Sequence, residues 1–217
     1  MKPGYYLVKD QDDSVSGQDS YTKFIWEVVG NDVSAKVKSS VPTSEKKVKD
    51  TNDTEGTKTW WQDSADYDIG DQVSFQLTGT VAQDYNDYKS VYQLVFHDTL
   101  SNGLTLDRDS FKSFIKNDSN EVLELNQYEV NITDDQHFTV TIKDVKVLGD
   151  DVSKVRVEYT ATLNENAVIG FLGNPNTMYM EFSNNPNNEQ GGDKGQTPED
   201  KVIVFTYKSC YQQNWFS

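Results

Sequence analysis

The chain has 217 residues, enough for one large or two modest domains with a buried core. Its 20 Lys and Arg against 35 Asp and Glu give a formal charge of −15, which repels phosphate backbones and anionic membranes and argues against a nucleic-acid partner. The single cysteine, Cys210, excludes an internal disulfide, and no stretch approaches the roughly 20 apolar residues of a membrane span or reads as a secretory signal.

Short runs rich in β-branched and aromatic residues recur along the chain, separated by clusters of Asp, Asn, Gly and Ser. Several alternate cleanly, as in KVRVEYTATL, where apolar side chains occupy every second position. This pattern predicts an all-β, antiparallel sandwich with one wet face on each sheet. In chain order, the predicted strands are YYLVK (5–9), TKFIWEVV (22–29), SEKKVKD (44–50), QVSFQLTGTV (72–81), VYQLVFHD (91–98), HFTVTIKDV (137–145), KVRVEYTATL (154–163), TMYMEFS (177–183) and KVIVFTY (201–207).

Helical periodicity is weak throughout, although residues 64–71 and 107–115 could each form a turn or a short helix. Residues 184–200 read as a polar, Gly-rich loop between two strands. Pro42 marks a boundary, because the residue before a proline is pushed toward an extended form. We therefore expect residues 1–41 to be the closing strands of a preceding unit or a linker, 42–207 to be one domain, and 208–217 to be a truncation or cloning artefact.

Three polar residues share the inward face of predicted strands with apolar ones: Lys46 with Val48, Asp98 at the end of VYQLVFHD, and Asn176 just before TMYMEFS. A buried lysine or aspartate costs several kcal/mol if charged and usually becomes neutral instead. A neutral amine is a nucleophile, and a protonated carboxylic acid can polarise an amide. The pattern therefore suggests an intramolecular isopeptide bond between Lys46 and Asn176, catalysed by Asp98, with loss of ammonia.

Other interpretations of these residues stay open at this point. Lys46 could extend its amine to the surface or form a buried salt bridge with Asp98, and Asp98 and Asn176 could serve turns at strand ends. The nearest rivals are Lys47 for the amine, which faces outward, and Asn174 or Asn184 for the amide, which share the parity of Asn176.

A family resemblance favours the cross-link. The sequence contains PTSEKKVKD, SADYDIGDQVSFQLTGTV, YKSVYQLVFHDTLSNGLTLDRDSFK, VEYTATLNENAVIG, GNPNTMYMEFSNNPN and GQTPEDKVIVFTYK in this order. From Pro42 to about Tyr207 it resembles the isopeptide-forming middle domain of backbone pilins from sortase-assembled pili of Gram-positive bacteria. That resemblance implies an immunoglobulin-like antiparallel β-sandwich with an intramolecular Lys–Asn isopeptide bond. It assigns the bond to Lys46 and Asn176 and the catalytic role to Asp98 in HDTLS.

The segment before Pro42 is similar to the end of a pilin's first domain, where sortase joins a lysine to the next subunit. Lys38 occupies roughly that place, in KVKSS rather than a YPKN-like motif, so a solvated surface lysine is the competing interpretation.

The function predicted from sequence is a structural subunit domain of a pilus shaft, located outside the cell and anchored to the cell wall. Its predicted partners are neighbouring pilin subunits, joined through sortase. It would not be an enzyme, because the cross-link forms once without turnover, and it would need no cofactor. The acidic run at 9–19 lacks the spacing of a calcium loop, and the two histidines lack the spacing of a zinc site, so no metal is expected. The alternative is a cell-wall-anchored adhesin module that binds a host protein or glycan through exposed loops such as 184–200.

Overall fold

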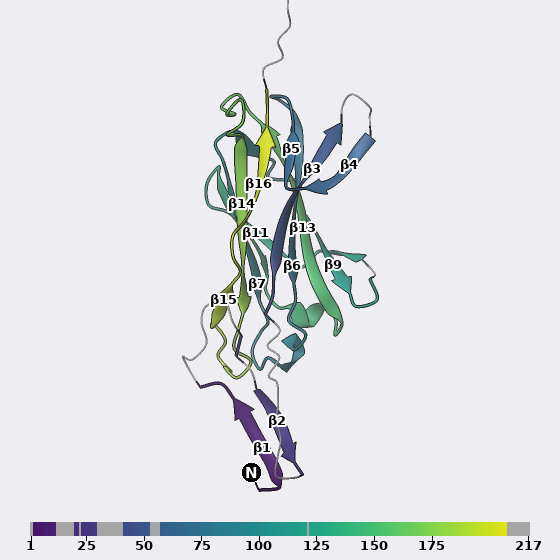
Figure 1. Cartoon of the computed structure of the whole chain (residues 1–217), viewed down its shortest axis with the longest axis vertical. Coiled ribbons are helices and arrows are strands. Elements are labelled where there is room, and N and C mark those ends of the chain that lie inside the picture. Colours follow the sequence, from purple (N-terminus) through teal and green to yellow (C-terminus); the bar gives the residue numbers. More distant parts are fainter. Residues whose placement is uncertain are drawn as a thin grey trace, which may run out of the picture.

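The computed structural model describes residues 2–11, 20–21, 23–29, 41–52, 57–120 and 122–207. A two-stranded hairpin, β1 (Gly4–Lys9) with β2 (Lys23–Val28), lies at one end of the long axis. The remaining strands form an elongated sandwich above it, and the last strand ends at the opposite end of the molecule (Figure 1).

Two sheets form the sandwich. The first sheet has the strand order β10-β9-β13-β6-β3-β4, with β8 pairing with β13 outside this path. Every pair in it is antiparallel. Its strands are β3 (Ser44–Asn52), β4 (Thr57–Gln62), β6 (Gln72–Thr80), β8 (Leu104–Leu106), β9 (Lys112–Asn117), β10 (Val122–Leu125) and β13 (Val152–Leu163).

The second sheet has the order β11-β12-β7-β14-β16-β5, with β15 pairing with β14. It is antiparallel except for the β16–β5 pair, which is parallel. Its strands are β5 (Ser64–Asp66), β7 (Leu94–Leu100), β11 (Glu129–Ile132), β12 (His137–Ile142), β14 (Asn174–Ser183), β15 (Lys194–Gln196) and β16 (Asp200–Phe205). The predicted sandwich of immunoglobulin-like type is confirmed.

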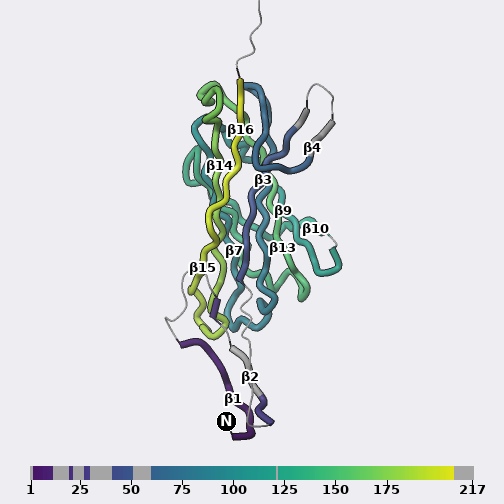
Figure 2. The backbone as a smooth tube through the Cα atoms, in the orientation of Figure 1, coloured from purple at the N-terminus to yellow at the C-terminus, as the bar shows by residue number. Residues whose placement is uncertain are grey.

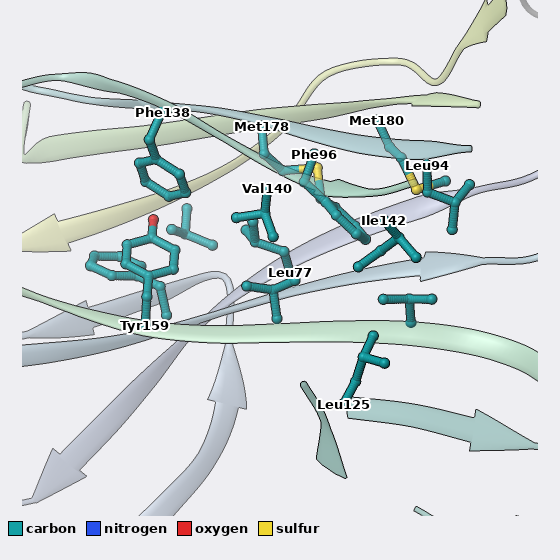
Figure 3. Close-up of a cluster of buried hydrophobic side chains, with 14 of the residues drawn as sticks. Leu77, Leu94, Phe96, Leu125, Phe138, Val140, Ile142, Tyr159, Met178 and Met180 are labelled. Atoms are coloured by element: carbon teal, nitrogen blue, oxygen red, sulfur yellow. The ribbon is translucent and has the colours of Figure 1, made fainter. Parts of the chain in front are cut away.

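The core lies between the two sheets, as the alternation requires. Leu77 of β6 and Tyr159 of β13 line this core from one sheet, and Phe96, Val140 and Met178 line it from the other (Figure 3). All five are at most 1% exposed. The sheets approach so closely at β6 that a side chain on Gly79 would place its Cβ 2.3 Å from the sulfur of Met180. A larger residue here would have to displace the Met180 thioether, so the packing favours glycine at this position.

Two expectations about irregular segments are refined. Residues 64–71 contain β5 and a turn at 69–70, and residues 107–115 contain a turn at 108–109 before β9, so neither forms a helix. The loop 184–200 includes β15, whose three residues are too few to show a period in the sequence. Short 3₁₀ turns occur at Tyr85–Asp87 (η1) and Val145–Leu148 (η2), and no helix in the described part of the chain is long and apolar enough to cross a membrane.

Figure 2 traces the backbone from the hairpin, through β3 as the first strand of the sandwich, to β16 as its last. Along this path the chain passes from one sheet to the other: β3 belongs to the first sheet, whereas β14, the neighbour of β16, belongs to the second.

Candidate functional site

Three strands bring the predicted residues together inside the sandwich. Lys46 projects from β3, opposite Leu77 in register, while Asp98 and Asn176 project from the adjacent strands β7 and β14 of the other sheet. Asp98 pairs with Met178, so Asn176 lies diagonally two positions away on the same face. Lys46 and Asn176 are 0% exposed and Asp98 is 2% exposed. The expected inward orientation of all three side chains is thus observed.

A fourth residue, Tyr159 of β13, joins the three. Its hydroxyl donates to Asp98 Oδ1 at 3.0 Å and accepts from Lys46 Nζ at 3.1 Å and from Asn176 Nδ2 at 2.7 Å. Lys46 Nζ also hydrogen-bonds to Asp98 Oδ2. Figure 3 shows the Tyr159 ring rising from its strand into the core, with the hydroxyl oxygen directed toward the opposite sheet.

Aromatic rings surround this cluster and keep it dry. Tyr159 stacks on Phe75 and Phe111, with centroids 5.3 and 5.6 Å apart, and meets the edge of Phe138 at 4.9 Å. Lys46 Nζ lies 5.5 Å from the Phe75 ring centre and 5.4 Å from that of Tyr159. Such ring faces attract a cation weakly but cannot replace its hydration shell.

Burial sets the protonation preferences of the site. It lowers the pKa of the Lys46 ammonium, against the opposing pull of the Asp98 carboxylate. It raises the pKa of Asp98, which the Lys46 charge and the Tyr159 hydrogen bond oppose. It also raises the pKa of Tyr159 well above its ordinary value, so the phenol stays protonated. The directions favour an uncharged amine beside an uncharged acid.

The amide of Asn176 is held at one end only. Its Nδ2 donates to Tyr159, whereas its Oδ1 is buried and has no hydrogen-bond partner among the described residues. A buried carbonyl without a donor costs about 1–3 kcal/mol. An amide oxygen that accepts from a carboxylic acid has a more electrophilic carbon, and Asp98 is the buried carboxyl group on the adjacent strand. The site therefore brings together an amine, an amide carbonyl and a carboxyl group in a buried cluster.

The rival residues lie elsewhere. Lys47 points to the outer face of β3, where its amine pairs with Asp63 at 2.6 Å and Glu45 at 3.1 Å. Asn174 is buried, but its amide is fully used by the backbone of Val168 and Val204.

The third rival, Asn184, is also buried, and its backbone carbonyl accepts from the Tyr21 amide near the hairpin. Lys38 and the tail 208–217 lie outside the described residues, so their predicted roles stay predictions. Within the described residues, no group of three or more His, Cys, Asp or Glu could hold a metal ion.

Tyr159 is the residue that sequence reasoning missed. Its position alternates with Val157 and Ala161 on the inward face of β13, opposite Phe75 in register. A polar hydroxyl among inward apolar residues was the available signal, and it is the same signal that selected Lys46.

Comparisons with known proteins agree with this architecture. No family model matches the chain. In sequence it is 27% identical over 202 residues to the trypsin-resistant surface T6 protein of Streptococcus pyogenes serotype M6, a match that covers 81% of this chain and 34% of that protein. The chain thus spans about a third of the length of this relative.

Solved structures with a similar fold include three from Gram-positive major pilins. BcpA, the major pilin subunit of Bacillus cereus, has a TM-score of 0.62 at 20% identity, covering 95% of this chain and 56% of that one. The T6 backbone pilin of serotype M6 S. pyogenes, described as a modular three-domain structure, has 0.58 at 21% identity, covering 87% and 44%. A 35 kDa C-terminal fragment of the Streptococcus agalactiae major pilin GBS80 has 0.56 at 21%, covering 76% and 56%. The predicted resemblance to backbone pilins is confirmed, and the chain has their fold.

Proposed function

We propose that this chain is a structural domain of a pilus shaft on a Gram-positive bacterium, locked by an autocatalytic isopeptide bond between Lys46 and Asn176. The observation that carries the proposal is the convergence of a buried amine, a buried acid and a buried amide on one hydroxyl between two sheets. Burying these three polar groups unreacted costs folding free energy. The part of that cost that is due to the amine is removed once the amine has formed the isopeptide bond.

The proposed reaction begins with the neutral form of Lys46, which burial favours. Nζ attacks Cγ of Asn176 while the Asp98 acid hydrogen-bonds to Oδ1 and stabilises the developing oxyanion. The Nζ–Cγ bond forms, the Cγ–Nδ2 bond breaks, and ammonia leaves. An amide is a poor electrophile, but folding holds the partners together, and well-oriented intramolecular groups reach effective molarities of about 10⁵ M or more.

A shaft subunit would gain mechanical strength from this link. The bond would join β3, the first strand of the sandwich, to β14, which is hydrogen-bonded to the last strand, β16. Tension that enters at one end of the long axis and leaves at the other would then pass through a covalent connection between the sheets (Figure 1). Unlike a disulfide, the link would resist reduction.

The surroundings of the domain are part of the proposal. Residues 42–207 would form the isopeptide domain, and residues 1–41 would belong to a preceding unit or a linker, in keeping with the separate hairpin sheet. Neighbouring pilin subunits joined by sortase would be its partners on the cell wall, with Lys38 as the candidate acceptor. The adhesin alternative stays a prediction, because no feature of the described loops favours a particular host ligand.

Intact-mass spectrometry of the purified chain tests the proposal. The wild type is expected to be lighter than its sequence by one ammonia, and Lys46→Ala, Asp98→Ala and Asn176→Ala are each expected to restore the full mass. Lys47→Ala is the matched control, because it removes the adjacent amine on the outer face and should keep the deficit. A wild type of full mass would refute the cross-link.

A further inference from the structure

The hydroxyl of Tyr159 contacts both nitrogen atoms that take part in the proposed reaction. It accepts from Lys46 Nζ, the nitrogen that attacks, at 3.1 Å. It accepts from Asn176 Nδ2, the nitrogen that leaves, at 2.7 Å. Among the described residues Asp98 hydrogen-bonds to Lys46 and to the Tyr159 hydroxyl but not to Nδ2.

The position of the Tyr159 hydroxyl matters because the proposed reaction has to move a proton between these two nitrogens. When a neutral amine attacks an amide and expels ammonia, one proton must leave Nζ and one must arrive on Nδ2, since an amide nitrogen cannot depart as an anion. The net change is one proton moved between two nitrogens a few ångströms apart. Because the site is dry, bulk water is badly placed to carry that proton.

We propose that Tyr159 is a catalytic residue of the cross-linking reaction, whose hydroxyl passes the proton from Lys46 Nζ to the departing nitrogen of Asn176. The inference rests on the proposed function. As Nζ bonds to Cγ, the phenol oxygen takes the proton of Nζ, and its own proton turns from Asp98 Oδ1, to which it is donated in the structure, to Nδ2, so that Tyr159 ends as it began. Asp98 then keeps a separate task, hydrogen bonding to the amide oxygen.

The environment of Tyr159 favours a role in passing a proton on over a role as a general base. Its ring packs against Phe75, Phe111 and Phe138. These ring contacts hold the hydroxyl in place, so its position does not depend on its hydrogen bonds. The residue is 1% exposed, and burial disfavours a free phenolate. A group that cannot keep a charge has to take and give a proton together, which is what the exchange requires.

The test uses the full chain made in a short cell-free pulse, quenched in acid at intervals and weighed intact, so that the rate of ammonia loss is measured directly. Tyr159→Phe keeps the ring stack and deletes only the hydroxyl. Tyr92→Phe is the matched control, because Tyr92 is equally buried and, within the part of the chain that the structure describes, its hydroxyl only accepts a 3.4 Å bond from the Ala82 amide. We expect Tyr159→Phe to slow the reaction about a hundredfold, within the range of general acid–base catalysis, and Tyr92→Phe to change it less than about twofold.

A pH profile separates proton transfer from mere positioning. The wild-type rate should be nearly flat from about pH 6 to 8, because the proton moves internally. The Tyr159→Phe rate should be low and should rise toward low pH, because the leaving nitrogen then depends on the few protons that reach the dry site from solvent. The double variant Tyr159→Phe/Asn176→Ala, compared with Asn176→Ala, reports any effect on folding alone. Equal rates for Tyr159→Phe and Tyr92→Phe, or a slow variant with a flat profile, would overturn the relay. A wild type that never loses ammonia would instead refute the cross-link itself.

Discussion

Strand β3 presents two chemical environments one residue apart. On its inner face Lys46 is fully buried among aromatic rings, against an acid whose charge burial disfavours. On its outer face the Lys47 side chain is 24% exposed and pairs with Asp63 and Glu45, which are themselves largely in solvent. The same amine is thus a surface cation in one place and, in the other, a buried group whose charge burial disfavours. Solvent access, not residue type, makes the difference.

The largest expected effect comes from removing the inner amine. Lys46→Met keeps the apolar stem but cannot cross-link, so the proposed constraint on a loop of about 130 residues between positions 46 and 176 would be lost. By the loop-entropy model that constraint contributes about 5 kcal/mol to the free energy of unfolding. For a chain of this size the melting temperature should fall by about 10–20 °C, measured by calorimetry.

The matched variant for that experiment is Lys47→Met on the outer face, which should melt within a few degrees of the wild type. Equal melting temperatures for the two variants would mean that the inner amine is no more important than the outer one.

The second effect concerns the pH dependence of stability in chains that cannot cross-link. In the Asn176→Ala background, Asp98→Asn leaves Lys46 alone with its pKa lowered by burial. Between that lowered pKa and the ordinary value, the unfolded state binds one proton more than the folded state, so stability should rise with pH by about 1.4 kcal/mol per unit.

The opposite variant, Lys46→Met in the same background, leaves Asp98 with its pKa raised by burial. Above the ordinary aspartate pKa and below the raised one, the folded state binds the extra proton, so stability should fall with rising pH at the same slope. Denaturant titrations at several pH values measure both slopes. If the stability of the two variants changed with pH in the same direction, Lys46 and Asp98 would not be held uncharged in the folded state.

The third effect separates two buried asparagines on β14. Asn174→Ala removes three hydrogen bonds to the backbone of Val168 and Val204 and should cost about 2 kcal/mol. It should nevertheless keep the ammonia deficit in the intact mass, because Asn176 remains. A chain that regains full mass on loss of Asn174 would reassign the reacting amide.

Alternation in the sequence predicted the sheets and the inward parity of Lys46, Asp98 and Asn176, because a two-residue period determines which face a side chain occupies. It could not determine which strands from the two sheets lie opposite each other. Tyr159 illustrates the limit, since a tyrosine on the inward face of a strand is ordinarily a core residue. Only the meeting of β3, β7, β13 and β14 reveals that its hydroxyl joins the other three.

The smallest expected effect tests the outer face directly. Lys47→Ala removes ion pairs to Asp63 and Glu45 whose partners are 75% and 58% exposed, and exposed pairs of this kind contribute about 0–1 kcal/mol. The difference from wild type should shrink further as salt is added, because exposed charges are screened over about 8 Å at physiological ionic strength. Chemical denaturation of the two chains at low and high salt measures this. A loss comparable to that of Lys46→Met, persisting at high salt, would show that the outer amine is not an ordinary surface cation and would remove the contrast between the two faces of β3.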